Sequence, residues 1–580
     1  MKKCVKCGAE NSSESRFCKA CGAELTESPE PALNEQKELS GYSFRPVPDE
    51  EIQALVNRKT PFAEKVLASV LAFAVVAGLT FMVCDVRGDQ RQAVQIDMIC
   101  GKNKSIFLYN GERIDGSVRG DVEYCVTSAD GSAAYAIGTD GKIYAICKDG
   151  VEKIGKDAED AKISPKGNYI FYVNSENDGY LYNVKKDKSE KISSDVDINT
   201  AVFSPDGKTL AFNKTGSGDL CIYDGGDCKK IDEGVACAAV SDGAKRLYAT
   251  SYVAEPEAPE KPDASDYEDY DRYKAAYDEY NELYEQYQEA LEKYDSYMSG
   301  EDISLYYYPS LNADKRTELT DELLYGAEFN ENISQVVFRE TDGRTYFCEK
   351  DSEPKRISKE SLFPCSYNDM SYYCGINAGE IIGSDSLLNM SYRSEDALWY
   401  VDRKGDADKI DGDISAYYGV CISENGEKLC YINEDGKLLL TDAQTGESDR
   451  IAKDVNDFIP EKGFDAFYVL DKDDNLYYIK KNGNKEKIDR DVYSICEAPS
   501  GGIYYITDDH DLYFAEKTKS EKIDGSGNVM EVESGERSAM YYVKDSKKDK
   551  TATCVSVKGD EDFKDVYKDC VPFEYAHYAE

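Results

Sequence analysis

The stretch Ala201–Ile231 reads AVFSPDGKTLAFNKTGSGDLCIYDGGDCKKI and contains the phrase from which the predicted fold follows. An apolar residue leads into a Ser-Pro-Asp-Gly turn, two apolar runs follow with a Gly-rich turn between them, and a charged pair closes on an isoleucine. Short apolar runs bounded by turn residues are typical of β-strands. This stretch therefore predicts a small unit of short strands joined by tight turns.

The phrase recurs along the chain. Clear copies are AKISPKGNYIFYVNSENDGYLYNVKKDKSEKI (Ala161–Ile192) and VCISENGEKLCYINEDGKLLLTDAQTGESDRI (Val420–Ile451), and weaker copies begin near Val126, Ala239, Pro460 and Glu497. Outside two insertions, the closing residues stand 35 to 41 positions apart, namely Ile114, Ile154, Ile192, Ile231, Leu319, Ile357, Ile410, Ile451, Ile488 and Ile523.

A period of about 40 residues with four short strands per unit is the signature of propeller blades. A single four-stranded sheet cannot bury both of its faces, so neighbouring sheets pack face to face. We therefore expect a mainly β, multi-bladed β-propeller over residues 100–565, as one large ring or two smaller ones.

The phrase Phe203–Phe212, FSPDGKTLAF, resembles the blade repeat of TolB-like and related WD-type bacterial propellers. The resemblance implies that Asp-Gly forms the turn between the first two strands of a blade. Glycine is then needed where φ is positive, at Gly167, Gly207, Gly243 and Gly426. Pairing of Ser105–Tyr109 with the last strands near Thr551–Val557 would close a single ring.

An insertion at residues 254–300 interrupts the repeat. A Pro/Glu stretch, EPEAPEKPDAS, precedes a run from Asp266 to Met298 in which apolar residues alternate spacings of three and four. This spacing predicts a helix with a coiled-coil-like seam. The seam consists of Tyr270, Tyr273, Tyr277, Tyr280, Tyr284, Tyr287, Leu291 and Tyr294. Two alternatives follow: the helix lies against the propeller, or it projects and pairs with another copy or another protein.

Residues 1–25 contain two CxxC pairs, Cys4/Cys7 and Cys18/Cys21. Four thiolates complete a closed tetrahedral site, which holds a fold together and leaves no position for catalysis. One structural zinc ion is expected, with two disulfides as the alternative. The stretch resembles the short zinc-ribbon modules at the N-terminus of many bacterial membrane proteins, and the resemblance implies protein contacts and no activity.

Residues 66–84, VLASVLAFAVVAGLTFMVC, carry no charge and are long enough to span a bilayer as one helix within residues 61–86. Residues 26–60 precede them as an acidic, Pro-containing linker with a short juxtamembrane helix. Because thiolate zinc sites belong in a reducing compartment, we expect the N-terminus in the cytosol and the propeller outside the cell membrane. The fourteen cysteines from Cys100 to Cys570 permit disulfides without demonstrating them.

The net charge of −43 disfavours nucleic-acid binding. Only His510 and His577 are present, which leaves little for Ser-His-Asp or Cys-His catalysis, and Asp471–Asn475 reads as a hairpin turn and not as a calcium loop. The sequence favours a non-enzymatic, membrane-anchored binding or scaffold protein for a protein or cell-envelope polymer, with homo-oligomerisation through the inserted helix as a further expectation. The alternatives are a carboxylate-based hydrolase at the axial mouth of the propeller and a transmembrane sensor.

Overall fold

The computed structural model divides into two units, residues 1–73 and residues 74–580, which are described separately. It describes residues 2–3, 10–11, 96–101, 104–109, 112–256, 258–262, 270–298, 303–350, 352–365, 377–382, 385–394, 397–414, 420–423, 426–498, 501–525, 529–535, 539–545, 550–556, 566–568 and 570–572. In the first unit, β1 (Lys2–Lys3) pairs with β2 (Glu10–Asn11) in an antiparallel hairpin.

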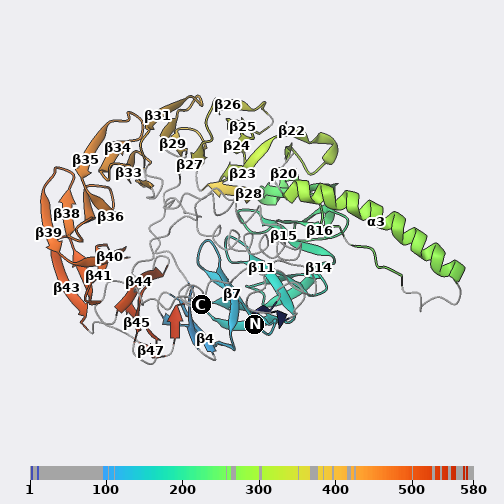
Figure 1. The fold of residues 1–580 in the computed structure, drawn as a ribbon, viewed down its shortest axis with the longest axis horizontal. Helices are drawn as coiled ribbons and strands as arrows, with labels where there is room; N and C mark the ends of the chain where they lie inside the picture. The colour runs from blue at the N-terminus through green and yellow to red at the C-terminus, as the bar shows by residue number, and fades with distance from the viewer. Residues whose placement is uncertain are drawn as a thin grey trace. The chain divides into compact units, whose positions relative to one another are not determined.

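The described part of the second unit forms eleven sheets, numbered here in chain order (Figure 1). Sheet 1 contains β3 (Ile96–Gly101), β4 (Lys104–Tyr109), β5 (Glu112–Arg113), β6 (Val118–Arg119) and β48 (Cys570–Pro572); sheet 2 contains β7 (Val122–Thr127), β8 (Ala133–Gly138), β9 (Ile143–Cys147) and β10 (Gly150–Gly155); sheet 3 contains β11 (Ala158–Ile163), β12 (Tyr169–Asn174), β13 (Gly179–Asn183) and β14 (Lys188–Ser193); sheet 4 contains β15 (Val196–Phe203), β16 (Leu210–Lys214), β17 (Asp219–Tyr223) and β18 (Lys229–Glu233); sheet 5 contains β19 (Val235–Val240), β20 (Leu247–Ser251), β21 (Leu305–Tyr308) and β22 (Thr317–Thr320).

The remaining sheets continue the series. Sheet 6 contains β23 (Leu323–Asn330), β24 (Gln335–Glu340), β25 (Thr345–Glu349), β26 (Lys355–Ser358) and β28 (Asn377–Ile382); sheet 7 contains β27 (Phe363–Pro364), β29 (Met390–Arg393), β30 (Leu398–Val401) and β31 (Ala407–Asp411); sheet 8 contains β32 (Val420–Ile422), β33 (Lys428–Ile432), β34 (Leu438–Asp442) and β35 (Ser448–Ala452); sheet 9 contains β36 (Val455–Pro460), β37 (Ala466–Asp471), β38 (Leu476–Lys480) and β39 (Lys485–Asp489); sheet 10 contains β40 (Val492–Glu497), β41 (Ile503–Thr507), β42 (Leu512–Glu516) and β43 (Lys519–Asp524); sheet 11 contains β44 (Val529–Gly535), β45 (Ala539–Asp545), β46 (Lys550–Ser556) and β47 (Val566–Lys568).

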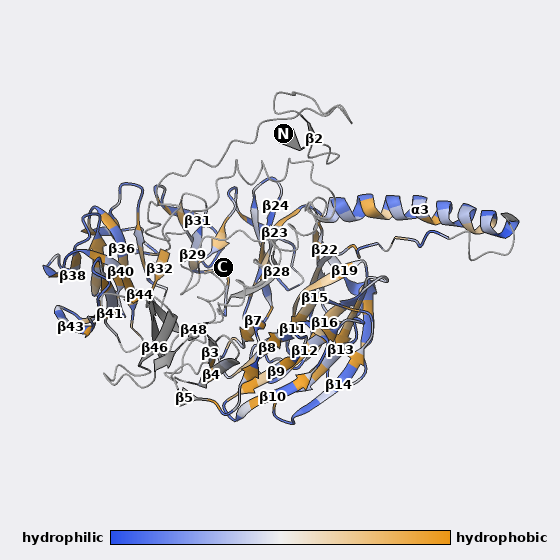
Figure 2. Ribbon diagram, turned by 60° about the horizontal axis from the view of Figure 1, so that its bottom comes forward, coloured by the Kyte–Doolittle hydropathy of each residue, from blue (hydrophilic) through white to orange (hydrophobic). Residues whose placement is uncertain are grey.

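Burial changes from one strand of a sheet to the next. The second strands, such as β8 (AAYAIG) and β37 (AFYVLD), are buried along nearly their whole length. The fourth strands, such as β39 (KEKID), are exposed apart from the half-buried Ile-Asp end. Figure 2 shows the same alternation of apolar and polar segments within the sheets. A strand covered on both faces needs a continuous apolar run, which explains why the repeat reads as it does.

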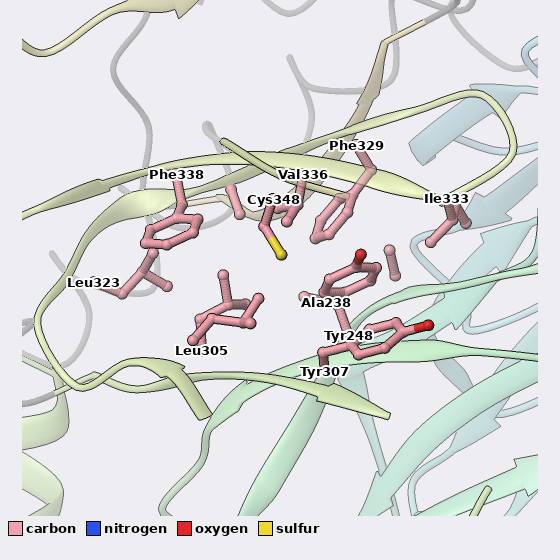
Figure 3. Close-up of a cluster of buried hydrophobic side chains, with 13 residues drawn as sticks. Ala238, Tyr248, Leu305, Tyr307, Leu323, Phe329, Ile333, Val336, Phe338 and Cys348 are labelled. Carbon is pink, nitrogen blue, oxygen red and sulfur yellow. The ribbon is translucent and has the colours of Figure 1, made fainter. Parts of the chain in front are cut away.

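The core is divided into clusters, and each cluster joins two consecutive sheets. In Figure 3, Tyr248, Leu305 and Tyr307 of sheet 5 meet Phe329 and Phe338 of sheet 6. The closing isoleucines follow the same rule, because Ile231 ends sheet 4 but packs against the cluster that contains Val235 and Leu247 of sheet 5. The isoleucine that ends each copy of the phrase therefore serves the next sheet.

A hydrogen bond from a tyrosine to an aspartate also recurs between consecutive sheets. The Tyr431 hydroxyl donates to Asp411 (2.6 Å) and the Tyr505 hydroxyl donates to Asp489 (2.8 Å). Tyr308 makes the same bond with Asp232 at 2.7 Å. The aspartates directly follow the closing isoleucines, so the closing Lys-Ile-Asp supplies both an apolar and a polar contact to the neighbouring sheet.

The predicted turns form as expected. Gly167, Gly207, Gly243 and Gly426 have φ values of 59°, 72°, 65° and 70°. In the turn between β15 and β16, the Gly207 N–H donates to the Ser204 carbonyl (2.8 Å). A Cβ on Gly207 would lie 2.9 Å from the Ser164 Cβ in the corresponding turn of sheet 3. The turns of successive sheets therefore touch, and glycine is required for space as well as for φ.

The two long gaps in the repeat contain the expected insertions. The first gap lies between β20 and β21 and contains α3 (Tyr270–Met298), so the expected helix is confirmed. The second gap supplies β28, which pairs with β23 in parallel and makes sheet 6 five-stranded. Short 3-10 helices occupy Asp242–Ala244 and Ala313–Lys315.

The ends of the β region pair differently from the prediction. Residues 105–109 lie in β4, which pairs with β3, β5 and β6, and not with β46. Instead β3 pairs with β48, with Cys100 opposite Val571. The prediction missed β48 because its three residues lie beyond the last recognisable repeat. A closed ring of blades stays a prediction.

Ten closing positions were read from the sequence, but sheet 11 makes an eleventh unit. Its last strand, β47 (VYK), lacks the closing isoleucine, which is why the periodicity did not include it. Among the described residues no helix is long and apolar enough to cross a membrane. The predicted span, residues 66–84, lies outside the described residues.

Candidate functional site

The expected metal centre belongs to the first unit, in which Lys3 lies opposite Glu10 in the β1–β2 pair. The four candidate ligands, Cys4, Cys7, Cys18 and Cys21, lie outside the described residues. Four soft thiolates are the donor set that structural zinc prefers, and such a closed set holds the fold and does not catalyse.

The inserted helix α3 carries an aromatic strip along one face. Its tyrosine rings follow one another with centroid separations of 5.9 Å (Tyr273–Tyr277), 5.8 Å (Tyr277–Tyr280), 5.7 Å (Tyr280–Tyr284) and 5.9 Å (Tyr284–Tyr287). We call these five residues with Leu291 and Tyr294 the tyrosine stripe. The side chain of Tyr270, the first residue of the predicted seam, lies outside the described residues.

The tyrosine stripe is not part of the sheet cores. None of the core clusters found among the described residues includes a residue of α3. Leu283 and Tyr284, at the middle of the helix, are 46% and 43% exposed. Both views show α3 extending away from β20 (Figures 1 and 2). The structure therefore disagrees with the alternative in which the helix packs along its length against the sheets.

The C-terminal end of α3 is anchored to the sheets. The Tyr297 ring lies edge-on to Tyr252, with 6.1 Å between centroids, and the Tyr252 hydroxyl donates to Asp197 at 2.7 Å. Burial, followed by the nearby Asp197 carboxylate, raises the pKa of Tyr297 to about 12, and the same two causes raise the pKa of Tyr252. Both phenols are therefore neutral at physiological pH, and the bond to Asp197 fixes the root of the insertion to sheet 4.

The Pro/Glu stretch that precedes α3 lies beside the helix, a contact that the sequence interpretation did not include. Pro256, Pro259 and Pro262 are half-buried, whereas Ala258 and Glu260 between them are exposed. A polyproline II helix has three residues per turn, so prolines at this spacing share one face. Lys261 Nζ lies 5.7 Å from the Tyr277 ring centroid, and the segment runs beside α3 in both views (Figures 1 and 2). The i, i+3 spacing of prolines before a tyrosine-rich helix was the available signal.

Two carboxylates stand at equivalent positions in sheets 3 and 9. The first strands of sheets 2, 3, 9, 10 and 11 share a register shift just after their first residue, and in β11 and β36 this shift is followed by Asp160 and Asp457. Each carboxylate accepts the next backbone N–H, from Ala161 (2.6 Å) and Phe458 (2.7 Å). Burial raises the pKa of both groups, that of Asp457 to about 6.

A raised carboxyl pKa suits a general acid, but glycoside hydrolysis typically uses two carboxyl groups close together. Asp160 and Asp457 belong to sheets separated by five others. Within the described ranges, no group of three or more His, Cys, Asp or Glu side chains could hold a metal ion. The ring Nδ1 of His510 lies 3.1 Å from the Val529 carbonyl, which gives this histidine a structural contact.

The suspected calcium-like loop is a turn, as predicted. Between β37 and β38, Asp471 Oδ1 accepts the backbone N–H groups of Asp473 (3.0 Å) and Asn475 (2.9 Å). Among the cysteines, Cys221, Cys237 and Cys430 are buried in core clusters and form no disulfide. They pack as small apolar residues.

Comparison with known families identifies one part of the chain. The zinc-ribbon domain model matches residues 3–25. The N-terminal module is a zinc-ribbon domain. Its family implies zinc binding, and the match covers both CxxC pairs of the ribbon. No curated protein matches the chain.

Several solved structures align with parts of the chain at low TM-scores. A eukaryotic initiation factor aligns with a TM-score of 0.37 and 10% identity over 83% of this chain and 96% of its own. TolB from Acinetobacter baumannii aligns with a TM-score of 0.23 and 16% identity, over 49% of this chain and 67% of its own. PorZ, a surface component of the type-IX secretion system of Porphyromonas gingivalis, aligns with a TM-score of 0.24 and 10% identity, over 79% of this chain and 65% of its own. Because these TM-scores are low, the likeness carries no functional argument.

Proposed function

We propose that this chain is a single-pass membrane-anchored binding or scaffold protein. In this proposal the zinc ribbon lies in the cytosol, residues 66–84 cross the membrane, and the series of sheets lies outside. The uncharged length of residues 66–84 supports the span. The preference of thiolate zinc sites for a reducing compartment supports the direction.

One observation carries the binding role. The chain has a net charge of −43, yet it extends an aromatic strip on α3 outside its described cores, where Leu283 and Tyr284 are 46% and 43% exposed. Exposed apolar surface is costly in water and is retained where it contacts a partner. In the sheets, by contrast, the apolar side chains pack against those of the neighbouring sheet. The ligand that we propose is a protein or a cell-envelope polymer, bound without turnover.

The orientation can be tested by thiol labelling of intact cells. A membrane-impermeant maleimide should leave peptides containing Cys4 and Cys7 unmodified until the cells are lysed and zinc is chelated. Cys147, which is partly exposed in sheet 2, should be modified in intact cells, and a Cys147→Ser variant controls for that signal. Modification of Cys4 in intact cells with Cys147 protected would reverse the proposed topology.

The binding role can be tested with the full-length protein and a variant without residues 256–300. Both proteins are incubated with envelope fractions. The material that each protein retains is then compared chemically with the starting fraction. We expect the full-length protein to retain a ligand in unchanged chemical form and the shortened variant to retain much less. Equal retention by the two proteins would remove the role assigned to the insertion.

A carboxylate-based hydrolase is the second candidate, and the raised pKa of Asp457 is the observation that favours it. Such an enzyme should degrade an envelope polymer in a reaction that Asp457→Asn abolishes. Under our first proposal, Asp457→Asn leaves ligand retention unchanged and no product accumulates with either protein.

A further inference from the structure

The residues that flank the tyrosine stripe differ from those on the rest of α3. The flanking positions are Lys274, Ala276, Asn281, Leu283, Gln288, Ala290, Asp295 and Tyr297. Only Lys274 and Asp295 among them are charged, with opposite signs and near opposite ends of the helix. The many acidic residues of α3, such as Asp278, Glu282 and Glu289, occupy the remaining positions around the helix.

This distribution bears on which partner the stripe can accept. Two chains of net charge −43 repel each other at long range. They can still associate where the contact face is free of acidic residues and offers complementary groups, as at the flanking positions of a coiled coil. On α3 the positions around the stripe carry no acidic residue from Ala276 to Ala290, and beside them Lys261 of the Pro/Glu stretch lies 5.7 Å from the Tyr277 ring centroid.

An antiparallel pair of α3 helices meets the second condition. When Tyr284 of one copy lies opposite Tyr287 of the other, Tyr280 lies opposite Leu291 and Tyr277 opposite Tyr294. In this register Lys274 of each copy lies beside Asp295 of the other, so two ion pairs form by symmetry. Leu283 then lies beside Ala290, a large residue beside a small one. These relations follow from the heptad positions of the residues in the sequence.

A parallel pair does not offer these contacts. It would keep Lys274 of one copy and Asp295 of the other about 30 Å apart, because 21 helical residues separate them. The two anchored ends would also lie side by side. In the antiparallel pair the anchored ends, at Tyr297 of each copy, lie at opposite ends of a rod about 43 Å long.

We propose that two copies of this chain associate through antiparallel pairing of their α3 helices, tyrosine stripe against tyrosine stripe. The partner is a second copy and not a basic peptide, because the flanking charges complement each other in that register. This inference rests on the binding role proposed for the tyrosine stripe, and it names a second copy of the chain as a protein that the stripe binds. Sedimentation of the purified protein tests the pairing, whereas retention of envelope material tests the wider binding role, so the two can fail separately.

Charge reversal in the full-length protein tests the pairing and its direction together. Lys274→Asp places two acidic groups at each end of the pair, and Asp295→Lys places two basic groups there. We expect each single variant to weaken the dimer about tenfold or more, measured as the dissociation constant by sedimentation equilibrium. The double variant Lys274→Asp/Asp295→Lys restores both ion pairs and should return to within about threefold of the unmodified chain.

Lys293→Asp is the matched control, because Lys293 is a similar exposed lysine outside the stripe and its flanks. It should leave the dissociation constant unchanged. Leu283→Glu, at the exposed middle of the helix, should give monomers while the helical circular dichroism signal persists. A chain that is monomeric at every concentration overturns the proposal. A double variant as weak as the single variants overturns the antiparallel register.

Discussion

Gly207 meets two structural demands at once. Its φ of 72° suits glycine, and its missing side chain leaves room for Ser164 in the turn of the preceding sheet. Gly216 has nearly the same φ, 71°, but a Cβ there would meet nothing within 4 Å. The two glycines therefore separate the cost of the backbone conformation from the cost of the contact between sheets.

We expect Gly207→Ala to lower the free energy of unfolding by about 2 kcal/mol and Gly216→Ala by about 1 kcal/mol. The difference reflects the contact with Ser164. Thermal unfolding of the two variants beside the unmodified chain measures it. Equal losses would show that the neighbouring turn moves away at no cost.

Asp457 should make stability depend on pH. Burial raises its pKa to about 6, so the folded state disfavours the ionised form. A raised carboxyl pKa contributes stability that is fully present below the unfolded pKa near 4 and is lost as the pH rises through 6. Between pH 4 and pH 7 this group should cost the folded protein about 2 kcal/mol.

Asp457→Asn should remove that loss, because the amide oxygen still accepts the Phe458 N–H and carries no charge. Urea unfolding at pH 4 and pH 7 gives the comparison. Asp408→Asn, at an exposed position, is the control and should leave the pH dependence as it is. A variant whose pH dependence matches that of the unmodified chain would contradict the assignment to Asp457.

Among the elements, the zinc ribbon can be tested by removing its metal. We expect one zinc ion per chain, and we expect chelation to release it with exposure of the four ribbon thiols, because the module is too short for its own core. The β-sheet circular dichroism signal should persist, since the sheets are held by their own clusters. Metal analysis and thiol titration provide the readouts. Full zinc content in a Cys4→Ser/Cys7→Ser variant would contradict the assigned ligands.

The insertion that contains α3 should be removable without loss of the sheets. It lies in the loop between β20 and β21, which pair directly through Thr250 and Leu305. Replacing residues 256–300 with a short Gly-Ser link should leave the melting temperature within about 2 °C, because no described core cluster includes α3 and loop closure depends weakly on length. Helical circular dichroism should disappear. A large drop in melting temperature would mean that α3 supports the sheets.

At the scale of the whole molecule, the terminal strand β48 joins the two ends of the β region. Truncation after Lys568 removes the pairs Cys570–Gly101 and Val571–Cys100 and leaves the edge of β3 open. We expect a loss of about 2 kcal/mol from the missing backbone hydrogen bonds. Truncation after Pro572 retains β48 and is the matched control. Identical thermal unfolding of the two truncations would argue against a stabilising role for β48.

The repeat, its turns and the helix could be predicted because they depend on local patterns. The Asp-Gly turn at Gly207 and the three-four spacing from Tyr273 to Tyr294 need no knowledge of distant residues. The ends could not be predicted, because β48 is three residues long and is defined only by its pairing with β3. The raised pKa of Asp457 depends on burial between strands, which the residue type does not reveal.

The sharing of each core cluster between two consecutive sheets determines how the molecule responds to a cut in the backbone. Each interface draws side chains from two consecutive sheets, as Tyr248 and Phe329 do across the exposed connection at Asp321 and Glu322. A protease that cut this connection would sever the chain at a point where the core is continuous. The two fragments would stay joined by an apolar interface, so a nicked molecule would keep its assembly although its covalent continuity is lost.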